Sequence, residues 1–256
     1  MQSVKIDLPR EPEVIEIHVL ADFHLGDPFC DEKLVRRQIE TVKSRENAYC
    51  ILNGDLLNTA LRGSVSDCYE EKISPMEQLK LIVGLMEPIA KKCLVITSGN
   101  HERRVAKDTS IDLMEIASRE LGVPYAADGA VLYVSCGQNV AEHRTNPIVY
   151  MIYTTHGSGG GRTEGGKINA LAQLVALVDA DIYVHSHVHL PGAFKEDYFR
   201  TNPNNRTTTR VTKLFVSTAA TLDYGGYAQR AKYRPASKDN PVIYLNGRKK
   251  EASAIV

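Results

Sequence analysis

Five short polar clusters in this sequence hold histidine, aspartate and asparagine, side chains that bind divalent metal ions through nitrogen and oxygen. In chain order they are Asp22-Phe23-His24, Gly54-Asp55, Gly99-Asn100-His101-Glu102, His156-Gly157 and His187-Val188-His189. None of them contains cysteine, the ligand that would favour a structural zinc site. Imidazole, carboxylate and carboxamide groups together suit Mn, Fe or Zn in a hydrolytic centre.

Each cluster follows an apolar run that predicts a buried strand. The predicted strands are Val14 to Leu20, Ala48 to Asn53, Cys93 to Thr97, Ile148 to Thr154 and Asp181 to Val184. A single polar residue at a strand end is usually a hydrogen-bonded group or a helix cap. Five such clusters in order instead indicate one shared site at the rim of an α/β sheet, because sites form where strands end.

The ordered series D-x-H, G-D, G-N-H-E, H and x-H-x-H resembles the motifs of the calcineurin-like metallophosphoesterases, and it spans Asp22 to His189. The resemblance implies two metal ions. One would be held by Asp22, His24 and His189, and the other by Asn100, His156 and His187, with Asp55 bridging them. It also implies that His101 binds no metal but stands beside the scissile phosphate, where it can protonate the leaving oxygen or steady the developing charge.

The resemblance also implies the chemistry of the site. Two divalent ions, manganese first and iron or zinc as alternatives, would share Asp55 at a spacing of about 3.5–4 Å and lower the pKa of a bridging water. The resulting hydroxide would attack the phosphate without a covalent protein nucleophile. Asn100 is a neutral ligand, which leaves the site able to accept an anionic phosphate. Catalysis is therefore expected to depend on His101, Asn100 and Asp55.

Two motifs depart from the family pattern. Ser186 takes the place of the glycine in the usual G-H-x-H. The segment from Gly54 to Ala60 lacks the second aspartate and the arginine of the G-D-x-V-D-R-G motif in protein Ser/Thr phosphatases. Glu102 with Arg103 and Arg104 nevertheless resembles the G-N-H-E-x-R of those phosphatases. The first motif, Asp22-Phe23-His24-Leu25-Gly26, instead resembles the D-x-H-L-G of recombination-repair nucleases and related phosphodiesterases.

We interpret the chain as a binuclear metal-dependent phosphoesterase, and within that class as a phosphodiesterase or nuclease whose substrate is DNA or RNA. The alternative enzyme is a Ser/Thr-type protein phosphatase or a small-molecule phosphomonoesterase. The alternative of another class is a metal-binding scaffold without catalysis, against which His101 and the complete ligand set argue.

Charge is distributed unevenly along the chain, although the net charge is zero. From Lys195 to Val256 there are 12 lysines and arginines against 5 acidic residues. Between Tyr224 and Arg234, tyrosines alternate with cations, a pattern that suits either nucleic-acid binding or a solvated surface. The glycine-rich stretch after His156 lacks the Ser or Thr that completes an ATP-binding loop. The candidate substrate-binding residues are Arg104, Arg162, Lys167, Arg230, Lys232 and Arg234.

Length and composition predict a single domain, residues 1–256, whose part from 195 to 256 is basic and rich in strands. The resemblance implies an α/β fold, a four-layer α/β/β/α sandwich of two mixed sheets. Segments Leu61 to Lys72 and Lys195 to Arg210 are polar and rich in turn residues, which predicts mobile insertions. Helices are predicted at Asp31 to Glu46, from Pro75 onward, at Ser110 to Leu121 and at Ile168 to Val178, and further strands at Val211 to Ser217 and Val242 to Leu245.

The sequence also bears on location. No apolar run approaches the roughly 18 residues that a membrane helix needs, and the amino end carries no charged-then-apolar export signal. The five cysteines form no C-x-x-C pair and are odd in number, which favours reduced thiols. We therefore expect a cytoplasmic protein with no membrane partner.

Overall fold

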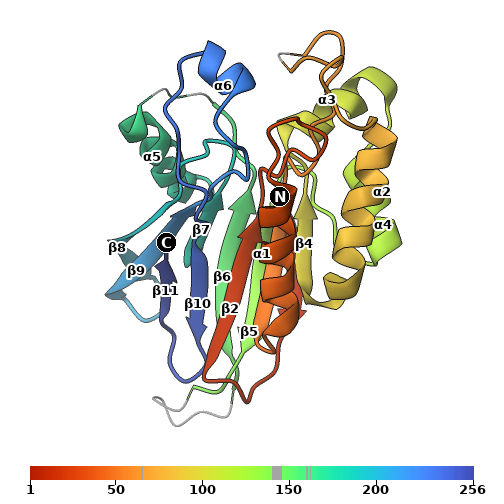
Figure 1. Ribbon diagram of the computed structural model, residues 1–256. Coiled ribbons are helices and arrows are strands. Elements are labelled where there is room, and N and C mark those ends of the chain that lie inside the picture. The colour runs from red at the N-terminus through yellow and green to blue at the C-terminus, as the bar shows by residue number, and fades with distance from the viewer. Residues whose placement is uncertain (65, 140–145, 160, 162) are drawn as a thin grey trace.

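The computed structural model describes residues 1–64, 66–139, 146–159, 161 and 163–256. Two β-sheets lie face to face, and helices cover the outer side of each sheet (Figure 1). The expected four-layer α/β/β/α sandwich of two mixed sheets is therefore confirmed. Among the helices of these described residues, none combines the length and the apolar composition that crossing a bilayer requires.

The first sheet has six strands in the order β1-β5-β6-β7-β9-β8. It is mixed, because β6, β7 and β9 run parallel whereas β5 pairs with β6, and β8 with β9, in antiparallel fashion. The strand bounds are β1 (Gln2–Asp7), β5 (Ala130–Cys136), β6 (Ile148–Thr155), β7 (Ile182–His185), β8 (Gly192–Asn202) and β9 (Thr207–Ser217).

The second sheet has five strands in the order β11-β10-β2-β3-β4. Its parallel part, β2 to β4, is joined to β10 by an antiparallel pairing. The strand bounds are β2 (Val14–Leu20), β3 (Ala48–Asn53), β4 (Cys93–Thr97), β10 (Val242–Asn246) and β11 (Ala252–Ile255).

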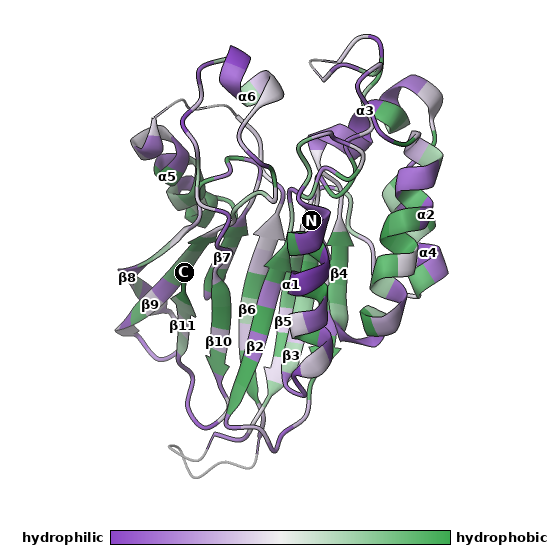
Figure 2. Cartoon of the chain, in the orientation of Figure 1, coloured by the Kyte–Doolittle hydropathy of each residue, from purple (hydrophilic) through white to green (hydrophobic). Residues whose placement is uncertain are grey.

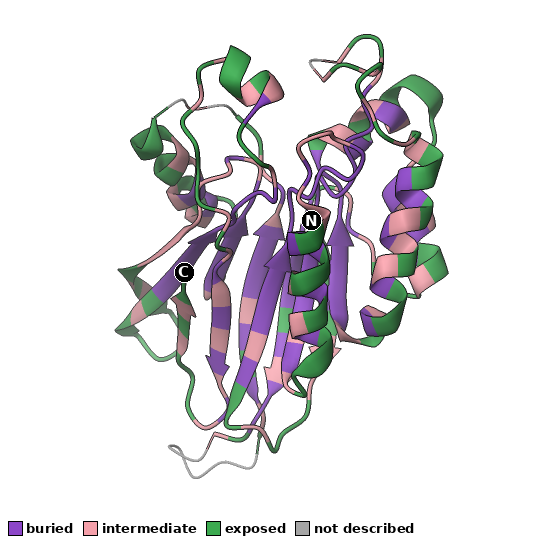
Figure 3. Cartoon of the chain, in the orientation of Figure 1, coloured by how far each residue is buried: buried purple, intermediate pink, exposed green. Residues whose placement is uncertain are grey.

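The space between the sheets is filled by β-branched and aliphatic side chains from both inner faces. Ile15 and Ile17 of β2 belong to the same buried cluster as Leu132 of β5 and Val184 of β7. The strands appear largely hydrophobic and buried in Figures 2 and 3. Burial of apolar surface contributes roughly 25 cal/mol per Å² to the free energy of folding. The packed sheets therefore hold the residues at their edges in fixed positions.

The outer helices are amphipathic and begin at defined caps. α1 (Glu32–Ser44) starts where the Asp31 side chain accepts a hydrogen bond from Leu34 N at 3.0 Å. α2 (Pro75–Met86) starts with a capping box between Ser74 and Glu77. Both helices and α4 (Leu113–Leu121) pack on the second sheet. α5 (Glu164–Ala172) and the short helix η3 (Gln173–Ala176) cover the first sheet.

Three further helices were not predicted from the sequence. η1 (Glu87–Lys92) extends α2 toward β4, α3 (Asn100–Thr109) begins directly after β4, and α6 (Gly226–Arg230) is a single short turn of helix near the carboxyl end. In Figure 1, α3 and α6 stand above the same edge of the sandwich.

The five strands predicted to carry the polar clusters all occur, and β2, β3 and β4 have the predicted bounds. The prediction of a mobile insertion from Lys195 to Arg210 was wrong. That segment belongs to a hairpin in which β8 and β9 pair from Gly192↔Ser217 to Asn202↔Thr207. The outer half of the hairpin has a polar sequence because it projects beyond the core, where both faces carry exposed or partly exposed side chains.

Candidate metal centre

The predicted clusters meet at one edge of the sandwich. Asp22 and Asp55 follow β2 and β3 of the second sheet, while His156 and His187 follow β6 and β7 of the first sheet. Asn100 opens α3 directly after β4. Strands from both sheets thus deliver side chains to a common site, as the sequence predicts.

Asn53, the last residue of β3, joins the two sheets beneath the site. Its Nδ2 atom donates to Thr155 O at 2.8 Å and to Ser186 Oγ at 2.7 Å, both beyond the sheet to which Asn53 belongs. Its Oδ1 atom accepts from the hydroxyls of Thr97 and Thr154. A fully bonded buried amide of this kind fixes the relative position of the strand ends.

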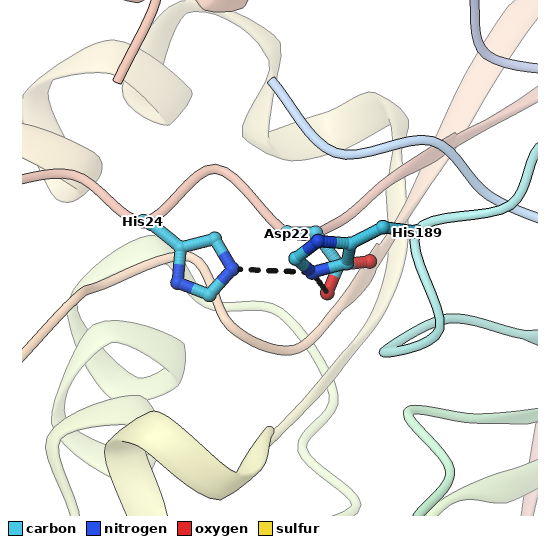
Figure 4. Close-up of side chains that lie close together, drawn as sticks. All are labelled: Asp22, His24 and His189. Atoms are coloured by element: carbon cyan, nitrogen blue, oxygen red, sulfur yellow. Dashed lines mark hydrogen bonds and ion pairs between the residues drawn. The ribbon is translucent and has the colours of Figure 1, made fainter. Parts of the chain in front are cut away.

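The first group of potential metal ligands is Asp22, His24 and His189, whose nearest ligand atoms lie within 4.8 Å of one another. His189 Nε2 is 3.2 Å from Asp22 Oδ1 and 3.4 Å from His24 Nε2 (Figure 4). Asp22 is held from its other oxygen, because His187 N and Thr218 Oγ1 donate to Oδ2 at 3.2 and 3.3 Å. Oδ1 therefore stays turned toward the two imidazoles.

The second group is Asp55, His156 and His187, again with ligand atoms within 4.8 Å of one another. His156 Nε2 lies 3.2 Å from Asp55 Oδ2. His156 Nδ1 lies 2.8 Å from Asn53 O. Since a carbonyl oxygen only accepts, Nδ1 donates there, and Nε2 is the ring atom that faces the site.

The two groups adjoin each other. A third set, His24, Asp55 and His101, takes one member from each group and adds His101. Asp55 is thus the residue whose carboxylate lies between the two groups, the position that a bridging ligand would occupy.

Two buried atoms show that a positively charged partner fits this site. Asp22 Oδ1 and His156 Nε2 are buried and make no hydrogen bond within the described part of the chain. Each belongs to a different ligand group. Their near contacts are to other groups of the site, at 3.2 Å from Asp22 Oδ1 to His189 Nε2 and from His156 Nε2 to Asp55 Oδ2. Divalent ions would satisfy both atoms, since neutral imidazole and carboxylate oxygen are their usual ligands.

The site is electrostatically arranged to keep its carboxylates ionised. Burial raises the pKa of Asp55, but His156 and His101 outweigh it and hold the pKa well below its usual range. Conversely, burial lowers the pKa of His156, yet the carboxylate of Asp55 raises it to about 9. Without metal, His156 therefore carries a proton at neutral pH, and a metal ion must displace it to bind.

His101 lies beside these groups and is oriented by the main chain. Its Nδ1 atom is 2.7 Å from Asn58 O, and its Nε2 atom is 3.9 Å from Asp55 Oδ2. Its ring meets the ring of His24 edge-on with centroids 4.4 Å apart. Burial lowers the pKa of His101 to about 4, so the ring is neutral at pH 7 and presents its Nε2 lone pair to the site.

The backbone is strained at the ligands. Nine non-glycine residues of the described chain have positive φ, and six of them lie in or beside the site, with φ between 43° and 68°. Such conformations cost about 1–3 kcal/mol each and persist where the surrounding structure enforces them. The six residues are Asp22, His24, Asp55, Thr59, His187 and His189.

Two glycines of the motifs make room for this packing. A Cβ atom on Gly99 would lie 2.0 Å from Asp55 Oδ1, and one on Gly54 would lie 2.5 Å from Gly99 N. Gly54 also has φ of +79°, which favours glycine. The glycines of G-D and G-N-H-E are therefore required because the two loops touch each other behind Asp55.

Sequence reasoning did not predict the supporting role of Glu102. This buried carboxylate accepts hydrogen bonds from the backbone nitrogens of Gly99, Asp55 and Leu57 at 2.8, 3.1 and 2.9 Å. It thereby fixes the Asp55 loop against the start of α3. Burial and the nearby charge of Asp55 raise its pKa to about 7. The capping-box spacing from Gly99 was the available signal for this role.

The structure places the remaining predicted site residues less centrally. Asn100 is exposed in the first turn of α3, and Arg104 is half-buried one turn later, with a buried Nη1 atom that has no hydrogen-bond partner in the described residues. Lys167 is half-buried on α5. Arg230 and Lys232 are exposed near α6, Arg234 pairs with Glu164 at 3.2 Å, and Arg162 lies outside the described residues.

The sheet order and the ligand groups agree with the resemblance drawn from the motifs. Two mixed sheets covered by helices are the architecture that the motif resemblance implies. No protein-family model and no curated protein sequence matches the chain.

Solved structures match at low similarity over nearly the full length. Vacuolar protein sorting 29 from Cryptosporidium parvum has 12% identity and a TM-score of 0.42, covering 95% of this chain and 97% of that one. A predicted phosphoesterase from Streptococcus pneumoniae has 13% identity and a TM-score of 0.38, covering 94% and 97%. A single mutant of Vps29 from Entamoeba histolytica has 12% identity and a TM-score of 0.42, covering 94% and 98%.

Proposed function

We propose that the protein is a binuclear metal-dependent phosphoesterase. One observation carries the proposal. Two ligand groups, each with one buried atom that lacks a hydrogen-bond partner, meet at the single carboxylate of Asp55. That arrangement suits two divalent ions that share a ligand, with manganese as the first candidate and iron or zinc as alternatives.

Asp22, His24 and His189 would hold one ion, and His156 and His187 the other, with Asp55 shared. Asn100, which opens α3, would join the second set as the motif resemblance implies. When bound, such ions lower the pKa of a water molecule and polarise a phosphate. Hydrolysis joins the oxygen of water to phosphorus and breaks the bond to the leaving oxygen, which must gain a proton.

His101 is the side chain that can donate this proton to the leaving oxygen. In the free protein its ring is neutral, and only Nδ1 carries hydrogen. It can protonate a leaving oxygen after Nε2 takes up a proton, which an anionic phosphate in contact with the ring would favour. Its Asn58 hydrogen bond holds it in place throughout.

Within phosphoesterases we favour a phosphodiesterase or nuclease. The D-x-H-L-G motif supports this choice, as does the absence of the phosphatase arginine, since Thr59 stands at that position of the motif here. The five cysteines are free thiols, which supports action in a reducing compartment such as the cytoplasm.

The experiment that tests the proposal compares four substrates in Mn²⁺: a bis-aryl phosphodiester, an aryl monophosphate, and single- and double-stranded DNA. Turnover of the diester and of DNA supports the favoured function, whereas turnover of the monophosphate alone supports a phosphomonoesterase or protein phosphatase. No turnover of any substrate by metal-loaded protein would contradict the proposal and leave a metal-binding scaffold. Asp55→Ala is the control that excludes a contaminating hydrolase.

A further inference from the structure

A further strand end reaches the metal centre besides those that the ligand motifs mark. β9 of the first sheet ends at Ser217, and the next four residues, Thr218-Ala219-Ala220-Thr221, contact the first motif beyond β2 of the second sheet. Thr221 N donates to Asp22 O at 3.1 Å, and Thr221 Oγ1 donates to Phe23 O at 3.2 Å. The segment 218–221 contains no histidine and no carboxylate, so no ligand motif marks it.

Thr218 is the member of this segment that contacts the side chain of a potential ligand. Its hydroxyl donates to Asp22 Oδ2 at 3.3 Å, and the residue is fully buried. Among the described residues this is the one hydrogen bond of the hydroxyl. The main-chain nitrogen of Thr218 donates to His185 O at 3.1 Å, which fixes the residue against the end of β7. The hydroxyl therefore acts on Asp22.

This contact gives the two oxygens of Asp22 different partners. Oδ2 accepts from Thr218 Oγ1 and from His187 N, the latter at 3.2 Å. Oδ1 accepts no hydrogen bond within the described part of the chain and lies 3.2 Å from His189 Nε2 (Figure 4). Because two donors engage Oδ2, Oδ1 is the oxygen that remains for a metal ion.

The two threonines of the segment hold different parts of Asp22. The backbone of Asp22 has φ of 52°, a left-handed conformation that persists where the surrounding structure enforces it. Thr221 N holds the main-chain carbonyl of Asp22, whereas Thr218 holds its carboxylate. Removing the hydroxyl of each threonine therefore separates an effect on the ligand side chain from an effect on the loop.

We propose that Thr218 is a positioning residue for the first metal ion, the one that Asp22, His24 and His189 would hold. Its hydroxyl keeps Asp22 Oδ1 directed at that ion. Without the hydroxyl, His187 N alone would hold the carboxylate, which could then turn. This inference rests on the proposed function and deepens its account of the binuclear centre. Thr218 makes no hydrogen bond to the side chains of the second group in the described structure, so the affinity of the second ion should change much less.

The test measures the Mn²⁺ affinities of both sites by calorimetric titration of metal-free protein. Thr218→Val keeps the shape of the side chain and removes its hydroxyl. It should weaken the binding of one of the two ions by about 10- to 100-fold, the usual effect of losing a hydrogen-bonded support of a ligand. Thr218→Ser keeps the hydroxyl and should restore most of the affinity. If the valine variant does not fold, Thr218→Ala takes its place.

Thr221→Val is the matched control, because this buried hydroxyl also contacts the first motif but donates to the main-chain oxygen of Phe23. Both Mn²⁺ affinities should stay near those of the parent. Electron paramagnetic resonance provides a second readout. At a Mn²⁺ concentration that fills both sites of the parent, Thr218→Val should show isolated ions where the parent and Thr221→Val show a coupled pair.

Several results would overturn the inference: parent-like affinities in Thr218→Val, equal losses in the two valine variants, or a serine variant as weak as the valine variant. These outcomes are independent of catalysis. If the parent binds two ions but hydrolyses no phosphate ester, the proposed function is wrong, and the same titrations still decide the role of Thr218. A parent that binds no metal ion would contradict both.

Discussion

The main-chain carbonyl of Asn58 holds His101, with Nδ1 donating to the oxygen at 2.7 Å. In the protein phosphatases that the sequence partly resembles, this position belongs to an aspartate whose side chain orients the histidine. Here the same residue does so through its backbone, while its side-chain Nδ2 donates to Glu71 at 3.0 Å. The loss of the aspartate therefore does not leave His101 without an orienting partner.

Replacement of His101 by Asn should spare metal binding and slow hydrolysis of an ester with a poor leaving group by about 10²–10⁴-fold, the usual contribution of a positioned acid or base. The loss should be smaller for nitrophenolate, which departs with little need of a proton. Rates for a series of leaving groups, with metal content measured in parallel, check this. Loss of metal from the variant would instead make His101 a ligand, as its place in the third cluster permits.

The stability of the metal-free protein should fall as pH rises from about 6.5 to 9. Asp55 raises the folded-state pKa of His156 to about 9 from 6.5, so this pair stabilises the fold fully below pH 6.5 and loses that contribution as pH rises through 9. Each unit of the shift corresponds to about 1.4 kcal/mol. Urea unfolding across this range measures the slope. His156→Asn should flatten it, and an unchanged slope in that variant would assign the effect to another group.

Asn53→Ala should destabilise the protein by roughly 2–5 kcal/mol. The change leaves the buried Thr154 hydroxyl without its acceptor and the Thr97 hydroxyl with the longer contact to Leu52 O at 3.5 Å. Each unsatisfied group costs about 1–3 kcal/mol. Asn204→Ala, on the exposed turn between β8 and β9, is the control and should cost little. Denaturant midpoints compare the two, and equal losses would mean that the Asn53 network does not join the sheets.

If nucleic acid is the substrate, Arg230→Ala and Lys232→Ala should each reduce the slope of log affinity against log salt by about 0.7–0.9, the contribution of one phosphate contact. Arg234→Ala should have a smaller effect, because Arg234 already pairs with Glu164. Turnover of a small aryl phosphodiester should not change. Unaltered salt slopes in the first two variants would show that the basic carboxyl-terminal part is only a solvated surface.

The sequence was sufficient to predict the ligand-bearing strands, because each is a short apolar run that ends at a polar cluster. β2 and β4 are buried along most of their length, and such runs carry a strong signal. By contrast β1, with alternating exposed residues at the edge of its sheet, and the polar half of β9 carry a weak one. Pairing with distant partners, rather than local pattern, makes those segments strands.

For the site, the motifs were sufficient to predict the candidate ligands, but they did not predict the groups that orient those ligands. The orienting carbonyl of Asn58 is a backbone group, which no motif can report. The left-handed conformations of Asp22 and His187 likewise depend on contacts between loops that are far apart in the chain. Glu102 was visible in its motif, yet its hydrogen bonds to the Asp55 loop required the fold.

Metal stoichiometry of Asp55→Ala tests the central claim most directly, because Asp55 belongs both to the second ligand group and to the set that includes His24 of the first group. After reconstitution with Mn²⁺ and removal of excess ion, elemental analysis should find two ions per chain in the parent and in Asn58→Ala, whose backbone carbonyl is intact. Asp55→Ala should hold fewer ions and lose most hydrolytic activity. Equal metal content in Asp55→Ala and the parent, or no bound metal in the parent, would contradict a binuclear centre built around this carboxylate.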